Sequence, residues 1–592
     1  MPQFYGQNYI RPQVVSIVDD TRLAGPNDIN TINIAVLGVA TGGAPMTALT
    51  FTSAREARRV LRSGELLDAI ERAYAPGPNQ AGAYRVTAIR VNAATRATAT
   101  LQTATQTNAI VLTSVDYGLH TNQISVAVAA GTTAGTKITV QKAASSIAPA
   151  ILVVGDNIYR SGIKVRYGAD FDGNAIAGAT GSAATLTVAY TGTPTALLTT
   201  SVTGATGDNL SIDLLTYTSL QQVVDQINAT GKYTAAVVGP DPNAAATTID
   251  AVSTASCYGT NLTTTANLQA QIDFFNSLSD VVSAAAATNA HTPADVVAQT
   301  FLAGGGEGTV PPSNGSWQSA FDILQTEDVQ LVVPVSGDAA IHAMAAAHCA
   351  SMSNAQNKAE RVAILGGVLG ESVTQVKTRA TTLNSDRAQI VWPGGTDLDP
   401  LGTGTTKNIA PYLLAAQKAG ITAGLPSGRA ATYQNIGITG LETKLTTSQV
   451  EDLLIAGVCP FEAKPRGGFR VVQDITTWQA DTRFSRRELS TRLALDIVSR
   501  TLRAALEPFI GSVNGPYLQA EVASDIAATL EVLTKRGVLV GGPGNPAYTN
   551  LTITVRGDIV EVAVQVSIAV PANYFFLTIF PTVFNSALAV SR

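Results

Sequence analysis

A long stretch without glutamate is the feature that most limits how this chain can fold. No glutamate occurs between Glu71 and Glu307. Residues 97–304 are instead dominated by Ala, Thr, Gly, Ser and Val, in short alternating runs such as residues 124–128. Alternating runs separated by turn residues are typical of β-strands. We therefore predict an inserted β-rich region of one or two domains, with one short helix near residues 219–227.

The inserted region also carries the acidic excess of the chain. Residues 97–304 contain six Lys or Arg residues and twelve Asp residues, which gives a net charge of −6, whereas the whole chain has a formal net charge of −5. We expect a region with this charge to lie on the outer surface. A nucleic-acid-binding protein normally has a basic surface, so no nucleic-acid partner is expected.

Strands and helices alternate on both sides of the inserted region. Before it, a β-rich run at residues 34–39 is followed by two helices and a strand at residues 84–91, and Ser53 and Glu56 have the spacing of a helix capping box. After it, strands are expected at residues 329–335, 361–365 and 387–392, with helices at residues 319–324, 338–351 and 372–383. This pattern predicts a single α/β domain that the insert splits in sequence.

The last third is predicted to form a C-terminal α/β domain. Helices are expected at residues 409–419, 447–455, 484–506 and 518–534, and strands at residues 469–474, 551–555 and 559–568. An apolar tail follows at residues 574–583. The helix at 484–506 has one apolar side.

A chain of 592 residues is too long for one compact core. The patterns together predict an α+β multidomain protein with a C-terminal α/β domain, a split α/β domain and an inserted β-rich region. The expected divisions are an N-terminal arm (1–30), the first part of the α/β domain (31–96), the insert (97–304), the second part of the α/β domain (305–406), the C-terminal core domain (407–572) and a C-terminal strand and arm (573–592).

Residues that could carry chemistry lack the required spacing. His342 and His348 are six positions apart, which places them on different faces of a helix. Gly366, Gly367 and Gly370 follow a strand but do not form the G-x-G-x-x-G motif. The chain has only four histidines and none of the common hydrolase motifs. We therefore predict no enzyme activity, no catalytic residue, no cofactor and no metal.

Cysteine usage and hydropathy indicate the compartment. Cys257, Cys349 and Cys459 are odd in number and far apart, which fits a reducing compartment better than a disulfide framework. No apolar run approaches the roughly 18 residues of a membrane span, so no membrane insertion is expected. Residues 1–10 do not have the pattern of a signal peptide.

Arginines gather on or beside the helix predicted at residues 484–506. They are Arg483, Arg486, Arg487, Arg492, Arg500 and Arg503. Glu488, Asp496 and Glu507 dilute their charge. Two interpretations stay open, an ordinary solvated helix face and a face that meets an acidic partner.

Six segments of the last third have a familiar order and spacing, residues 445–454, 456–460, 468–472, 474–477, 484–511 and 559–579. In these segments the chain resembles the shared C-terminal domain of contractile phage tail sheath proteins. The middle resembles the same family at residues 301–305, 316–317 and 332–334, and residues 31–96 resemble its N-terminal α/β unit. Each motif is weak alone, but their order and spacing make the resemblance specific.

The resemblance implies a structural subunit of a helical sleeve around an inner tail tube. Terminal arms of neighbouring copies would add strands to each C-terminal sheet, and contraction of the sleeve would drive the tube through the host envelope. The implied partners are other copies of this chain, the tail tube protein, and the baseplate and tail terminator proteins. The implied location is the phage virion, with assembly in the host cytoplasm.

The resemblance also suggests site residues. The residues expected to join neighbouring subunits are Val14, Val15, Ile17, Phe576, Leu577, Ile579 and Val583. Arg486 and Arg487 are expected to face the tube, because the C-terminal domain lines the lumen in this family.

Two other functions stay open. A phage-like injection device or bacteriocin has a sheath with the same mechanism, although the large insert favours a phage. A secreted β-rich adhesin or carbohydrate-active enzyme would suit residues 97–304 taken alone. The α/β units on both sides and the lack of a signal-peptide pattern argue against it.

Overall fold

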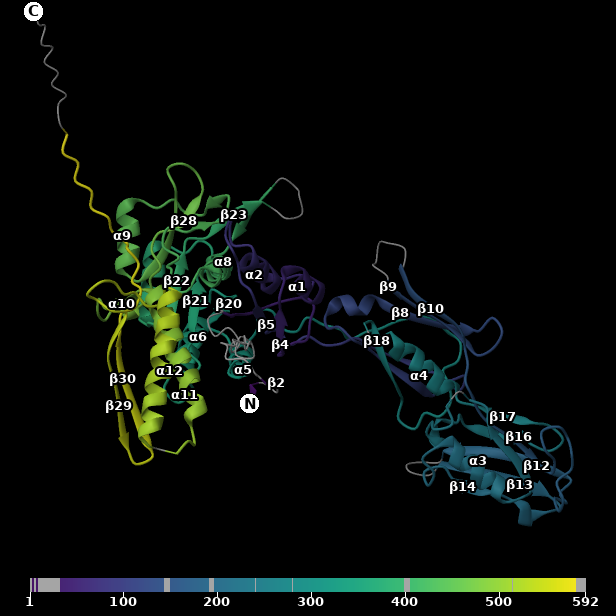
Figure 1. Cartoon of the computed structure of the whole chain (residues 1–592). Helices are drawn as coiled ribbons and strands as arrows, with labels where there is room; N and C mark the ends of the chain where they lie inside the picture. The colour runs from purple at the N-terminus through teal and green to yellow at the C-terminus, as the bar shows by residue number, and fades with distance from the viewer. Residues whose placement is uncertain are drawn as a thin grey trace, which may run out of the picture.

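The computed structural model describes residues 3–4, 7–8, 32–142, 150–190, 196–239, 241–278, 280–398, 405–513 and 515–581. Figure 1 shows an elongated molecule with two parts. The larger part contains helices and strands from both ends of the sequence, and the inserted region extends from it. The described residues form a mixed α/β multidomain protein.

A nine-stranded sheet forms the centre of the larger part. In spatial order its strands are β25 (Asn435–Ile436), β28 (Phe469–Val471), β27 (Val458–Ala463), β22 (Ala388–Trp392), β21 (Val362–Gly366), β20 (Leu331–Pro334), β3 (Ile34–Gly38), β5 (Val86–Arg90) and β4 (Ala48–Phe51). β20 pairs in parallel with β3, which precedes the inserted region. The residues of β3, β5, β20, β21 and β22 are buried throughout, as expected for parallel strands that are covered on both faces.

Helices cover both faces of this sheet. The core on one face includes residues of α1 (Ala54–Leu61), α2 (Glu65–Tyr74) and α8 (Pro411–Gly424). The core on the other face includes residues of α5 (Asn314–Leu324), α6 (Ala339–Met352), α7 (Val373–Leu383) and α9 (Thr447–Ile455). A separate three-stranded sheet contains β24 (Thr406–Ile409), β23 (Gly395–Leu398) and β26 (Gly440–Leu441), in this order. Half of the capping box expected at α1 is present, since the Ser53 side chain accepts a hydrogen bond from the Glu56 N–H. The Glu56 carboxylate accepts from the Thr52 N–H and not from that of Ser53.

The large sheet contains strands from both sides of the division expected between residues 406 and 407. β27 continues it beyond β22, with Ile390 paired to Val458 in parallel, and α8 packs against it along most of its length. The sheet therefore includes residues up to Val471. Sequence periodicity could not reveal this, because the chain passes from one set of elements to the next without a break in the α/β alternation.

The inserted region has two separate hydrophobic cores. The first core is built around α4 (Asn267–Ser277), β6 (Thr98–Gln102), β7 (Asn108–Ser114), β8 (Ile124–Ala130), β9 (Thr136–Lys142), β10 (Ala150–Ile158), β18 (Val282–Ala286) and β19 (Val297–Phe301). The second is built around α3 (Leu220–Ala229), β11 (Ser161–Tyr167), β12 (Ala183–Tyr190), β13 (Ala196–Thr203), β14 (Ser211–Asp213), β15 (Tyr233–Val237), β16 (Val252–Ser256) and β17 (Leu262–Thr265). α3 lies where a helix was predicted, whereas α4 was not predicted.

The C-terminal elements form a helical pair with a hairpin beside it. They are α10 (Phe484–Arg487), α11 (Leu489–Leu506), α12 (Pro516–Lys535), β29 (Tyr548–Arg556) and β30 (Ile559–Val566). Leu489 and Leu493 belong to the core of the large sheet, whereas Ile497 belongs to the core shared with α12. α11 therefore joins the hairpin region to the large sheet.

The single helix predicted at residues 484–506 is two helices. Glu488 between them has an extended backbone, with φ −91° and ψ 121°. Its neighbours make sheet-like hydrogen bonds to the preceding loop, from the Thr476 N–H to the Arg487 carbonyl at 2.8 Å and from the Leu489 N–H to the Asp474 carbonyl at 3.0 Å. These tertiary hydrogen bonds replace the helical ones at this point.

A further pair of short strands, β1 (Gln3–Phe4) and β2 (Gln7–Asn8), lies near the N-terminus.

Candidate assembly surfaces

His342 and Cys349 of α6 are buried. His342 Nε2 lies 2.8 Å from the Ser336 carbonyl oxygen, and burial together with the nearby Arg379 lowers the pKa of His342 to about 4. Burial raises the pKa of the Cys349 thiol to about 12. Both groups are therefore neutral near pH 7. Within the described ranges, no group of three His, Cys, Asp or Glu side chains is placed to hold a metal ion.

No described helix is both long enough and apolar enough to cross a membrane.

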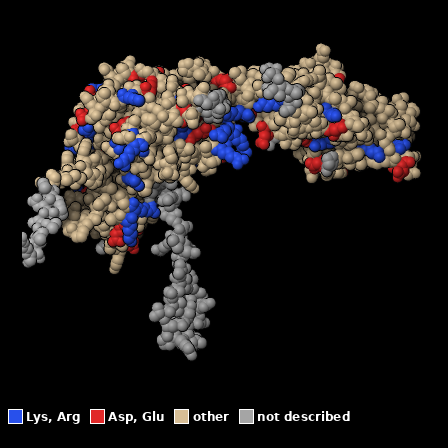
Figure 2. Space-filling model, turned by 90° about the horizontal axis from the view of Figure 1, so that it is seen from above, with Lys and Arg blue, Asp and Glu red and all other residues tan. Residues whose placement is uncertain are grey.

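Figure 2 shows one face of the molecule, with basic side chains gathered near the junction of its two parts. Arg55, Arg58 and Arg59 of α1 are exposed. Acidic and basic side chains are both scattered over the inserted region in this view.

The hairpin of β29 and β30 has two unpaired edges. The two strands pair with each other, from Tyr548 opposite Val566 to Arg556 opposite Ile559, and no other described strand joins their sheet. Side chains of its inner face pack against α11 and α12. Unpaired strand edges expose rows of N–H and C=O groups, which another extended segment can pair with.

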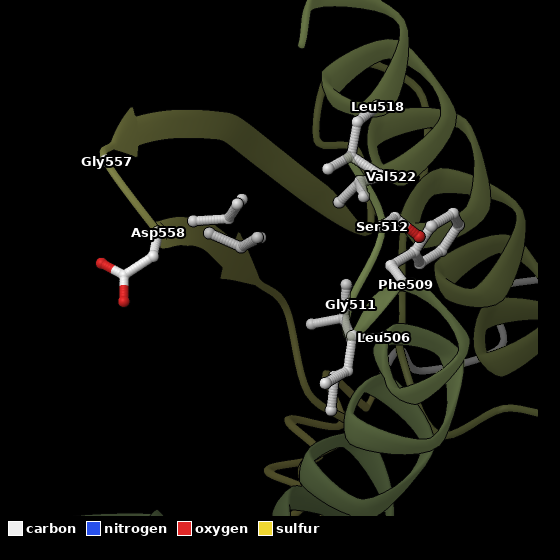
Figure 3. Close-up of a pocket in the computed structure, with 11 residues that line it drawn as sticks. Leu506, Phe509, Gly511, Ser512, Leu518, Val522, Gly557 and Asp558 are labelled. Atoms are coloured by element: carbon white, nitrogen blue, oxygen red, sulfur yellow. The ribbon is translucent and has the colours of Figure 1, made fainter. Parts of the chain in front are cut away.

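A cavity of about 680 Å³ lies between the hairpin tip and the two helices. Its apolar lining consists of Leu506, Phe509, Ile510, Leu518, Val522, Val560 and Val562. In Figure 3 the Leu518 and Val522 side chains point toward the hairpin, while the Asp558 carboxylate at the hairpin turn points away. An apolar side chain would therefore fit this site better than a charged one.

The C-terminal segment after the hairpin is apolar and exposed. The exposed fractions of Phe576, Leu577 and Ile579 are 97%, 83% and 76%, and Tyr574, Phe575 and Phe580 are similarly exposed. The segment runs away from the hairpin tip (Figure 1), so it does not cover the cavity of its own subunit. The other residues expected to join subunits, Val14, Val15, Ile17 and Val583, lie outside the described residues.

The two arginines expected to face a tube make contacts within the chain. The Arg486 guanidinium lies 4.7 Å from the centre of the Trp478 ring, and Arg487 Nη2 donates a hydrogen bond to the Leu454 carbonyl at 3.3 Å. Both side chains are partly exposed.

The other arginines of this cluster also have partners. Arg492 pairs with Asp386 and Asp496, and Arg503 pairs with Glu360 at 2.6 Å. Three of the six arginines of the cluster, Arg483, Arg492 and Arg503, thus form ion pairs inside the molecule, a role that the sequence alone did not indicate.

The known proteins that this chain resembles are all described as tail sheath proteins. Residues 311–477 match the family model described as the phage tail sheath protein central domain. Residues 445–477, which resemble a C-terminal sheath domain by their motifs, therefore fall within the stretch that matches the central domain, in agreement with their place in the large sheet.

Individual relatives extend the match along the chain. The tail sheath protein of Bacillus phage SP01 is 26% identical over 590 residues, which covers 97% of this chain and 96% of the relative. A putative tail sheath protein of Enterococcus phage phiEF24C is 29% identical over 527 residues, covering 86% and 87% of the two chains.

A solved structure shows the same fold. The sheath tail protein of Desulfitobacterium hafniense has a TM-score of 0.54 at 14% identity, and the match covers 95% of this chain and 96% of that one. The resemblance to contractile phage tail sheath proteins, first indicated by scattered motifs, is therefore confirmed by a family model, by full-length relatives and by fold.

Proposed function

We propose that this chain polymerises into a helical sleeve around a tail tube and that contraction of the sleeve drives the tube through the host envelope during genome delivery. The single observation that carries the proposal is the exposed apolar segment at residues 574–580, in a chain whose hairpin has unpaired edges. The similarity to tail sheath proteins of phages supports it. Because these relatives come from phages, we favour a phage tail over a bacteriocin or injection device.

The terminal segments would join one subunit to the next. Strand addition to β29 or β30 satisfies backbone N–H and C=O groups without requiring a particular side-chain sequence. Burial of a large apolar side chain contributes about 1.5–3 kcal/mol. The six large side chains between residues 574 and 580 would then contribute on the order of 10 kcal/mol, before the loss of chain freedom on ordering is subtracted. A link of this size would keep subunits joined while the sleeve rearranges.

The remaining partners follow from the same proposal. A tail tube protein would lie inside the sleeve, with baseplate and tail terminator proteins at its ends. Phage tail sheath proteins are virion components, and we propose that this chain assembles in the host cytoplasm. The energy of contraction would be stored in the assembled lattice, so the mechanism requires neither a nucleotide nor a cofactor.

Electron microscopy of the purified full-length chain tests the proposal. We expect tubes or stacked rings, and we expect the variant F576D/L577D to remain folded without forming them. A matched control is Leu398→Asp, an exposed apolar residue outside the hairpin region, which should polymerise normally. A wild-type chain that stays monomeric at all concentrations would contradict helical self-assembly.

A further inference from the structure

Glu488 is a buried acidic residue between α10 and α11. Its exposed fraction is 2%, although its backbone is extended and lies at a break between two helices. Three segments meet at its side chain. They are the loop that contains Gln473, the α10–α11 junction itself, and the C-terminal segment at Asn573.

One carboxyl oxygen of Glu488 has two donors and the other has none. Oε1 accepts hydrogen bonds from Gln473 Nε2 at 2.7 Å and from Asn573 Nδ2 at 2.8 Å. Oε2 is buried and has no hydrogen-bond partner among the described residues. The same is true of the Asn573 side-chain oxygen, Oδ1. A carboxylate oxygen and an amide oxygen are both acceptors, so these two atoms cannot satisfy each other unless one carries a proton.

We propose that Glu488 is a neutral carboxylic acid that pairs reciprocally with the Asn573 amide and so fixes the point where the C-terminal segment leaves the subunit. The Oε2–H group donates to Asn573 Oδ1, while Asn573 Nδ2 donates back to Oε1. A single proton then satisfies both orphaned acceptors. Glu488 and Asn573 together are called the acid–amide clasp below.

The charged groups around Glu488 favour its neutral form. Asp474 in the adjacent loop is a buried acid, and its partner is Lys418 of α8, with Nζ 2.5 Å from Oδ1. Lys418 is thus already engaged by another carboxylate. Burial is the main cause that raises the pKa of Glu488 to about 7, and the charge of Asp474 adds to it. The hydrogen bonds from Gln473 and Asn573 and the charge of Arg487 act in the opposite direction.

Cys459 of β27 is a further titratable group in this electrostatic neighbourhood. Burial raises the pKa of its thiol to about 12, so it stays neutral across the pH range in which Glu488 titrates. Below pH 7 the clasp is closed. As the pH rises above 7, Oε2 loses its proton and two acceptors face each other, which weakens the attachment of Asn573.

The clasp fixes the direction in which the segment directly after Asn573 leaves the subunit. Tyr574 and the apolar residues up to Phe580 are exposed, so Asn573 is the last residue before them with a side-chain hydrogen bond to the buried interior. An open clasp would let the segment leave the subunit in other directions. The clasp joins two parts of one chain, so this inference does not depend on self-assembly.

The experiment compares wild-type protein with Glu488→Gln, using the full-length chain. The glutamine amide keeps the reciprocal pairing at every pH, because it both donates to Asn573 Oδ1 and accepts from Nδ2. Chymotrypsin cleavage after Tyr574, Phe575 and Phe576 is measured for both proteins at pH 6 and pH 8. The ratio of the two rates cancels the pH dependence of the protease.

We expect a rate ratio of wild type to Glu488→Gln near one at pH 6 and a several-fold higher ratio at pH 8. Infrared difference spectra between the two proteins should show the C=O band of a protonated carboxyl group at pH 6 and its loss at pH 8. A flat rate ratio, or a carboxylate already ionised at pH 6 and held by a buried water, would overturn the proposal.

A second variant covers the case in which Glu488→Gln does not fold. The variant Asn573→Ala removes the amide that pairs with Glu488. Asn573 is only partly buried, so this substitution should be tolerated by the fold. Cleavage of the segment should then be faster than in wild type at pH 6, whereas the two proteins should be cleaved at similar rates at pH 8. Equal cleavage of Asn573→Ala and wild type at pH 6 would show that the pair does not hold the segment.

Discussion

Arg387 and Asp496 form a buried, two-pronged ion pair that joins the start of β22 to α11. Arg387 Nη2 lies 3.0 Å from Asp496 Oδ1, and Nη1 contacts Oδ2. The exposed fractions of the two side chains are 6% and 3%. Since β22 belongs to the large sheet and α11 carries the hairpin region, this pair connects the two.

Removing one partner of this pair should destabilise the larger part of the molecule. We expect Asp496→Ala to lower the free energy of unfolding by about 3–5 kcal/mol, because Arg387 would be left as an unpaired buried charge. The three tryptophans, Trp317, Trp392 and Trp478, all lie outside the inserted region. Tryptophan fluorescence in a urea titration therefore reports on this part alone.

The exposed pair of Lys377 and Asp452 provides a control. Its side chains are 37% and 56% exposed and lie 3.5 Å apart. Asp452→Ala should change stability by about 0–1 kcal/mol, as is usual for surface ion pairs. A similar loss in both variants would mean that burial of the Arg387–Asp496 pair has no special effect.

Stability should also depend on pH through Glu488. Its pKa is raised from the ordinary value of 4.5 to about 7 in the folded chain. A raised pKa means that its contribution is fully present below pH 4.5 and is lost as the pH rises to about 7, a loss on the order of 3 kcal/mol. The measurement is the difference in free energy of unfolding between wild type and Glu488→Gln at pH 5 and pH 8. No change in that difference would show that Glu488 titrates normally.

Much of the α/β part could be predicted from the sequence, because buried parallel strands are short continuous apolar runs and their helices have clear caps. Ser372 and Gln375, for example, form the complete capping box of α7. The extent of the large sheet could not be predicted, since strand order is set by long-range packing. The pairing of Ile390 with Val458 has no local signal.

The candidate site was harder to predict. The apolar character of residues 574–580 was evident, but the cavity between α11, α12 and the hairpin depends on how these elements pack. Glu488 was interpreted only as diluting a basic helix face. Its burial follows from the break between α10 and α11, which arises from tertiary hydrogen bonds to Thr476 and Asp474 rather than from helix propensity.

Deletion of residues 1–20 tests the N-terminal arm. We expect a folded, soluble subunit that cannot form tubes, because the deletion removes the apolar run containing Val14, Val15 and Ile17. Circular dichroism and electron microscopy of the truncated chain provide the two measurements. Normal polymerisation of this truncation would count against linkage through the N-terminal arm.

Replacement of residues 97–304 by a short Gly/Ser linker tests the role of the insert. The flanking ends already lie together, since the Thr95 N–H donates to the Gly306 carbonyl at 2.9 Å. Glu307 must be kept, because it pairs with the buried Arg90 at 2.6 Å. We expect the shortened chain to fold and assemble.

The insert deletion also removes Asp116, which pairs with Arg62. Arg62 is exposed, so the loss of its partner should have a small effect. Collapse of the large sheet in the shortened chain, seen as loss of its cooperative urea transition, would instead show that the insert belongs to that core.

Arg486 and Arg487 are proposed to contact the tail tube. We expect Arg486→Glu with Arg487→Glu to impair assembly on the tube while the subunit stays folded, because guanidinium groups suit carboxylates of a partner. An exposed pair contributes only about 0.2–1 kcal/mol, which is weak enough to break during contraction and strong enough to align many copies. High salt should loosen the same contact by screening.

The intramolecular contacts of these arginines require a control for charge reversal itself. Arg486→Gln with Arg487→Gln also removes the contacts to Trp478 and to the Leu454 carbonyl, but it introduces no repulsion. If only the glutamate variant fails to co-sediment with tubes, the defect comes from charge facing an acidic partner. If both variants fail equally, the arginines act through packing within the subunit. A structure of the assembled tail in which Arg486 and Arg487 face solvent or a neighbouring sheath subunit would contradict the tube assignment, and the terminal segments alone would then account for assembly.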